Sequence, residues 1–91
     1  SAVQRKRFEL EGKKIGFIGL GAIGRETQKI CAAIGMRTAG YDPFLTSVQV
    51  EGMGAEYYSD YRELMRDCDV VSIHVPLTEQ TRNMITGREL G

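Results

Sequence analysis

The sequence has few of the residues from which metal centres and disulfide frameworks are built. Its 91 residues include two cysteines, Cys31 and Cys68, and a single histidine, His74. Two cysteines are too few for a disulfide scaffold, and no C-x-x-C pair or histidine cluster indicates a metal site. We therefore expect buried, reduced thiols, no metal ion and a cytoplasmic protein.

Long apolar runs and an excess of one charge are also missing. No stretch of eighteen apolar residues could cross a bilayer, and no signal-peptide pattern is present. The 12 basic and 12 acidic residues cancel, which argues against a general role at nucleic acids or membrane surfaces. The length allows at most one small domain, and the 42% apolar share is typical of a globular fold.

The sequence does contain a glycine-rich loop framed by regular elements. Residues 19–24 read Gly-Leu-Gly-Ala-Ile-Gly; they follow a strand predicted over 14–18 and lead into a helix predicted over 22–34. A second strand is predicted over 36–41, and Asp42 closes it. A G-x-G-x-x-G pattern alone is common, but this frame is typical of a βαβ unit that holds a dinucleotide.

The remaining sequence continues the alternation of strands and helices. A short helix over 46–51 precedes a strand over 55–58, and the next helix is capped by Ser59 or Asp60, with Glu63 completing a capping box. A last strand over 70–75 ends at Pro76. Helical connections require parallel strands and right-handed crossovers. We therefore predict an α/β, Rossmann-type parallel sheet of order 3-2-1-4 with flanking helices. We also predict that residues 1–13 are a basic lead-in and that residues 14–91 are a partial dinucleotide-binding domain.

Helical periodicity predicts which faces of the two longer helices are apolar. The first stripe consists of Ile23, Thr27, Ile30 and Ile34, and the second of Tyr61, Leu64, Met65 and Cys68.

The three glycines of the loop have different predicted roles. Gly19 allows a tight turn, Gly21 lets the backbone approach a pyrophosphate, and Gly24 lets the helix pack against the strand. The amides of Gly21, Ala22 and Ile23 lie at a helix N-terminus, where a phosphate is favoured. The alternative is a glycine-rich turn that binds no ligand.

Asp42 is the predicted ligand of the adenosine ribose, whose hydroxyls its carboxylate can bind. The same charge would repel a 2′-phosphate, so the predicted cofactor is NAD rather than NADP. The alternative is a turn-forming Asp-Pro pair. Arg25 is most simply a solvated helix residue, with a pyrophosphate contact as its alternative. For His74, a structural or adenine-wall role is expected rather than proton transfer.

Four blocks of the sequence carry a resemblance to a known family. They are residues 16–25, GFIGLGAIGR; residues 40–43, GYDP; residues 68–78, CDVVSIHVPLT; and residues 81–85, TRNMI. The sequence resembles the nucleotide-binding domain of D-isomer-specific 2-hydroxyacid dehydrogenases. The resemblance implies NAD-linked hydride transfer between a 2-hydroxy acid and its 2-oxo acid. It also adds Val75 and Pro76 at the adenosine end and Thr81 near the cofactor. The full set of predicted cofactor-binding residues is Gly19, Gly21, Ala22, Ile23, Gly24, Asp42, Val75, Pro76 and Thr81.

The resemblance also implies what the chain leaves out. The family's substrate-binding arginine and its glutamate–histidine pair would fall after Gly91, and much of the substrate lobe before Ser1. The sequence predicts an N-cap at Thr86 and the first turn of another helix over 87–90, so we expect the chain to be a fragment of a longer protein. We therefore expect a cofactor-binding part without catalytic residues, from an enzyme that is a homodimer when full length. The alternatives are a regulatory NAD-sensing module and a structural fragment that binds nothing.

Overall fold

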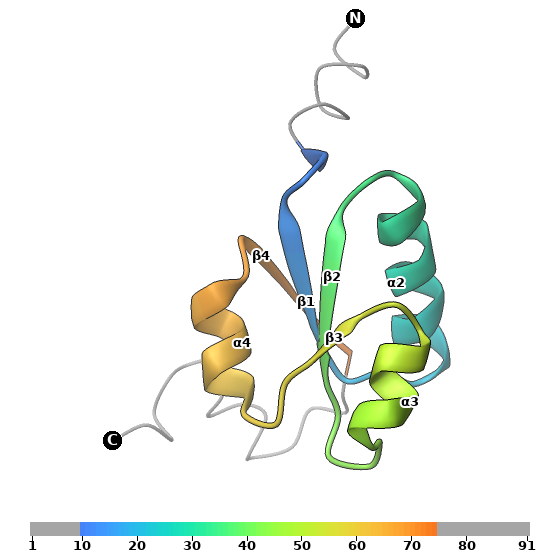
Figure 1. Ribbon diagram of the computed structural model, residues 1–91, viewed down its shortest axis with the longest axis vertical. Helices are drawn as coiled ribbons and strands as arrows, with labels where there is room; N and C mark the ends of the chain where they lie inside the picture. Colours follow the sequence, from blue (N-terminus) through green and yellow to red (C-terminus); the bar gives the residue numbers. More distant parts are fainter. Residues whose placement is uncertain (1–9, 75–91) are drawn as a thin grey trace, which may run out of the picture.

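The computed structural model describes residues 10–74, in which strands and helices alternate along the chain (Figure 1). The elements in chain order are β1 (Lys14–Ile18), α2 (Ala22–Ala33), β2 (Arg37–Tyr41), α3 (Ser47–Gly52), β3 (Glu56–Tyr57), α4 (Tyr61–Asp67) and β4 (Val70–Ile73). None of the helices in this part of the chain is long and apolar enough to cross a membrane.

The strands form one parallel sheet of order β3-β2-β1-β4, which confirms the predicted topology. Gly16 in the central strand β1 lies opposite Ala39 of β2 and Val71 of β4. The strand order reverses between β1 and β4. A ligand in an open sheet of this kind binds beyond the carboxyl ends of the strands at such a point.

Two layers of helices cover the sheet: α2 and α3 lie on one face, and α4 lies on the other (Figure 1). Ile15 and Phe17 of β1 pack beneath α2 and α3, with Leu20 and Val50 in the same core. Ile18, on the opposite face of β1, packs with residues of α4 in a second core. Every residue of β1 is buried, as expected for a parallel strand that is covered on both faces.

The predicted apolar stripe of α2 is wrong for most of its length. Ile23 is 73% exposed and Ile30 is 59% exposed. Gly24 and Gln28 are the buried residues of this helix instead. The buried stripe is thus turned by one residue from the apolar one, because α2 packs against the glycine loop through Gly24, which has no side chain, and against β2 through Gln28. Periodicity of apolar residues cannot identify a contact that glycine makes.

Gln28 is only 1% exposed, and hydrogen bonds compensate its burial. Its Nε2 atom donates to Thr38 Oγ1 at 3.0 Å and to the carbonyl oxygen of Met53 at 3.2 Å. Gln28 therefore connects α2 to β2 and to the turn after α3. A buried polar group that is satisfied in this way can occupy a core position.

The prediction for α4 holds for Tyr61 and Leu64, which are buried, and Cys68 is partly buried. Met65 is 38% exposed, so its assignment to the buried stripe is wrong. Asp60 caps the helix as predicted, and its side chain accepts from the Arg62 amide at 2.9 Å. This contact, with the second residue after the cap, takes the place of the predicted capping box with Glu63.

A capping box forms instead at α3, where the hydroxyl of Thr46 accepts from the Gln49 amide. The Gln49 side chain accepts from the Thr46 amide in return.

Strand β3 is shorter than predicted, covering only Glu56–Tyr57, and β4 ends at Ile73. Val75, the last predicted residue of that strand, lies outside the described residues.

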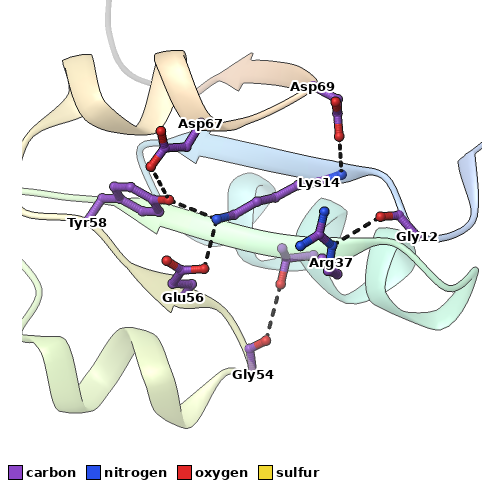
Figure 2. A network of polar contacts seen from close by, with 9 residues as sticks. Gly12, Lys14, Arg37, Gly54, Glu56, Tyr58, Asp67 and Asp69 are labelled. Carbon is purple, nitrogen blue, oxygen red and sulfur yellow. Dashed lines mark hydrogen bonds and ion pairs between the residues drawn. The ribbon is translucent and has the colours of Figure 1, made fainter.

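A polar network ties the amino end of β1 to β3 and α4 (Figure 2). Lys14 Nζ lies 2.8 Å from Glu56 Oε1 and donates to Tyr58 Oη at 2.8 Å. Tyr58 Oη in turn donates to Asp67 Oδ2 at 3.0 Å. The contacts with Glu56 and Tyr58 raise the pKa of Lys14, and Lys14 lowers the pKa of Glu56. This network lies at the start of β1, whereas the glycine loop follows its end.

Candidate functional site

The glycine loop leaves β1 while remaining bonded to the neighbouring strand. The Gly19 amide donates to the carbonyl oxygen of Tyr41, the last residue of β2, at 2.8 Å. Gly19 has a φ of +99°, a conformation that a residue with a side chain rarely adopts. The predicted tight turn at this position is therefore present.

Gly24 and Gly21 face different surroundings. A Cβ atom built on Gly24 would lie 2.5 Å from the carbonyl oxygen of Gly19, whereas one built on Gly21 would meet nothing within 4 Å. The missing side chain at Gly24 thus lets α2 pack against the loop. The missing side chain at Gly21 leaves space above the backbone, as a closely approaching ligand requires.

The loop opens into a hollow at the N-terminus of α2. Its lining consists of Gly21, Ala22, Ile23, Gly24 and His74. Gly21 is the N-cap of α2 and supplies no side-chain hydrogen bond, and the first turn of the helix carries no acidic residue. The first amides of a helix have no partner within it, and the helix dipole favours negative charge there. The hollow therefore has the properties of an anion-binding site.

Asp42 lies beside this loop, at the exit of β2. Its Oδ2 atom accepts from the Leu20 amide at 2.9 Å, and its Oδ1 atom accepts from the Phe44 amide at 2.8 Å. The second contact is the local turn that an Asp-Pro pair predicts, and the first links the carboxylate to the glycine loop. A carboxylate oxygen accepts more than one hydrogen bond, so both atoms can still bind a hydroxyl group.

Arg25 makes a contact that its sequence position did not indicate. Its Nε atom donates to the carbonyl oxygen of Leu20 at 3.0 Å, although the residue itself is exposed. The side chain therefore returns to the loop rather than being fully solvated. Pairing of a side chain with a backbone carbonyl five residues earlier leaves no signal in the sequence.

His74 borders the hollow. Its backbone amide donates to the Ile18 carbonyl at 2.8 Å, and its Nε2 atom lies 2.6 Å from Ser72 Oγ. Its ring stacks on Phe17 with a centroid separation of 6.0 Å. These contacts hold the histidine in place at the wall of the hollow, where it lies next to Gly24 of the glycine loop.

The remaining candidates add no further chemistry in the described part of the chain. Val75, Pro76 and Thr81 lie outside residues 10–74. Cys31 and Cys68 are partly buried rather than fully buried as expected, and this burial raises the pKa of both thiols, which disfavours the reactive thiolate. No group of three or more metal-ligating side chains occurs among residues 10–74.

A parallel sheet with a glycine loop and a helix N-terminus at its switch point defines a Rossmann-type dinucleotide-binding unit. The chain belongs to the family described as "D-isomer specific 2-hydroxyacid dehydrogenase, NAD binding domain", which it matches over residues 2–91. This result confirms the resemblance seen in the sequence and NAD as the cofactor.

Individual relatives carry the names of several 2-hydroxyacid enzymes. The chain is 48% identical over 88 residues to D-3-phosphoglycerate dehydrogenase of Methanocaldococcus jannaschii, covering 93% of this chain and 17% of that protein. It is 44% identical over 82 residues to hydroxypyruvate reductase of Thermotoga maritima, covering 88% and 25% of the two chains. Among solved structures, NAD+-bound 3-phosphoglycerate dehydrogenase of Entamoeba histolytica is 35% identical with a TM-score of 0.67, covering 79% and 22%. The chain thus spans about a quarter or less of each of these three proteins.

Proposed function

We propose that this chain is the cofactor-holding part of an NAD-dependent oxidoreductase that interconverts a 2-hydroxy acid and its 2-oxo acid. The observation that carries the proposal is the open backbone of Gly21 at the N-terminus of α2, with the carboxylate of Asp42 bonded to the same loop. Residues 14–91 are the proposed domain, and residues 1–13 its basic lead-in.

The described residues fit the two polar parts of an adenine dinucleotide. The amides of Gly21, Ala22 and Ile23 would hold the pyrophosphate, because they line a hollow that contains no acidic side chain. Asp42 would bind the ribose hydroxyls through lone pairs that its two backbone contacts leave free. Gly19 and Gly24 would shape the loop, and Val75, Pro76 and Thr81 are proposed to complete the adenosine end.

NAD supplies the hydride acceptor when it is bound, and the residues of this chain bind and orient it. The groups that hold the substrate and transfer its proton are proposed to lie elsewhere in the longer protein, so we assign no catalytic residue here.

We propose 3-phosphoglycerate as the substrate of the longer protein, because the 48% identical relative is named for it. A cytoplasmic homodimer is the proposed state of that protein. The relatives are named as dehydrogenases and reductases, which gives the sensing alternative no support.

Calorimetry of the protein with NADH and NADPH tests the proposal. We expect NADH to bind more tightly, by about tenfold, because the 2′-phosphate of NADPH would face the Asp42 carboxylate. Asp42→Ala should narrow this ratio. Glu26→Ala, which removes an exposed carboxylate from the outer surface of α2, should preserve it. Equal affinities in the unmodified protein would contradict the ribose assignment.

A further inference from the structure

The residue between the first two loop glycines is held on three sides. Leu20 is 1% exposed, and its side chain lies so close to Gly40 that a Cβ atom built there would come within 2.5 Å of Leu20 Cδ1. Its carbonyl oxygen accepts from Arg25 Nε at 3.0 Å. Its amide donates to Asp42 Oδ2 at 2.9 Å. Leu20 therefore anchors the loop to the core, to α2 and to the end of β2.

Of these three contacts, the one with Asp42 joins the loop to a residue that is itself proposed to bind the cofactor. A hydrogen bond from an amide to a carboxylate is charge-assisted and shorter and stronger than one between neutral groups. The carboxylate is itself held by the Phe44 amide at 2.8 Å, so its direction is set before any ligand arrives. Because Gly21 follows Leu20 directly, the orientation of Leu20 determines where the Gly21 amide points.

We propose that Asp42 is a positioning residue for the pyrophosphate loop, in addition to its proposed contact with the ribose. The inference rests on the proposed function, since it concerns the same cofactor site. One carboxylate then couples the two parts of the ADP moiety: it binds the sugar and holds the amides that bind the phosphates. Replacing it to admit NADP should therefore also weaken pyrophosphate binding for both cofactors.

Ligands that lack ribose hydroxyls separate the two roles. We compare 2′,3′-dideoxy-ADP with 2′,3′-dideoxyadenosine by NMR titration, because neither can bind Asp42 through the sugar and only the first carries the diphosphate. In Asp42→Ala we expect about a fivefold to tenfold loss of affinity for dideoxy-ADP and none for dideoxyadenosine. Removing a negative charge would by itself favour binding of the anionic ligand. A loss of dideoxy-ADP affinity would therefore indicate that the loop amides are no longer held in position.

Two further variants control for charge and size. Glu26→Gln removes an exposed carboxylate that is separate from the loop and should leave dideoxy-ADP affinity unchanged or slightly raised. Asp42→Asn preserves the size of the side chain, but it replaces one of the two oxygens that accept from the Leu20 and Phe44 N–H groups with an NH2 group, which can only donate. It should therefore weaken dideoxy-ADP binding in the same direction as alanine.

The outcomes distinguish the inference from the proposed function. If the unmodified protein binds neither NADH nor dideoxy-ADP, the proposed function fails. If it binds both, and the Asp42 variants weaken the binding of NADH but not that of dideoxy-ADP, the ribose role stands and the positioning role is overturned. Unfolding of both Asp42 variants would also overturn it, because the carboxylate would then support the whole fold rather than the loop.

Discussion

Gly24 lies against the carbonyl oxygen of Gly19, and a Cβ atom at Gly24 would approach that oxygen to 2.5 Å. The two residues are the ends of the glycine loop, so this contact sets the distance between the start of α2 and the end of β1. The obstructing atom is backbone and cannot rotate away. Gly21, between them, has open space where its side chain would lie.

Alanine at Gly24 should therefore cost folding stability as well as binding. We expect Gly24→Ala to lower the free energy of unfolding by about 1–3 kcal/mol, measured by urea denaturation, because the helix must shift to relieve the clash. NADH affinity should fall with it. A variant as stable as the unmodified protein would show that the loop tolerates this displacement.

Alanine at Gly21 should affect binding alone. The backbone there is extended, with a φ of −75° and a ψ of −165°, which alanine adopts readily. We expect Gly21→Ala to change the free energy of unfolding by less than about 1 kcal/mol. Its NADH affinity should fall by about tenfold or more, because the added methyl group occupies the space above the loop. Unchanged affinity in calorimetry would place the pyrophosphate elsewhere.

The order and parallel arrangement of the strands could be predicted because each strand and helix has its own local signal. Glycine and proline mark the ends, β-branched residues mark β4, and an apolar run marks β1. The buried face of α2 could not be predicted from apolar periodicity, because that face is formed by Gly24, which packs against the loop, and by a hydrogen-bonded Gln28. Long-range polar contacts such as that of Lys14 with Glu56 likewise have no local signature.

The candidate site also has one part that the sequence predicts and another that only the structure shows. The glycine loop and Asp42 follow a pattern whose spacing reflects the geometry of a βαβ unit, so the sequence suffices to locate them. The bond from the Leu20 amide to Asp42 and the return of Arg25 to the loop depend on how the chain folds back on itself. The structure is needed to see that Asp42 contacts the loop.

Gln28 and Ile30 provide a direct test of which face of α2 is buried. Gln28→Leu should lower the free energy of unfolding by about 1–3 kcal/mol, because the carbonyl of Met53 loses a hydrogen-bond donor in a partly buried setting. Ile30→Gln should change it by less than about 0.5 kcal/mol, because Ile30 is 59% exposed. Thermal or urea denaturation of both variants measures the difference. The reverse order would mean that α2 buries its isoleucines.

Lys14 should stabilise the fold from the end of the sheet opposite the loop. Lys14→Met preserves much of the side-chain volume but removes the donor to Glu56 and Tyr58. We expect a loss of about 1–2 kcal/mol in the free energy of unfolding, moderated because Glu56 is 59% exposed. Lys13→Met, at the exposed neighbouring position, should cost far less. NADH affinity of the folded Lys14 variant should remain unchanged.

Glu56 should contribute to the acid sensitivity of the protein. The hydrogen bond from Lys14 lowers the pKa of Glu56 from its ordinary value of 4.5. The unfolded chain therefore takes up this proton at a higher pH than the folded protein does. The stabilisation is fully present above the ordinary pKa and is lost as the pH falls through the lower, folded value. Glu56→Gln should reduce the loss of unfolding free energy between about pH 5 and about pH 3.

The expected difference is less than about 1 kcal/mol, because water screens the exposed carboxylate. Urea denaturation across this pH range measures it in the single variants and in the double variant with Lys14→Met. Because the Lys14 ammonium group is the largest cause of the lowered pKa of Glu56, Glu56→Gln should change the pH dependence much less once Lys14 is methionine. If the glutamine variant and the unmodified protein lose stability equally on acidification, the pair does not couple protonation to folding.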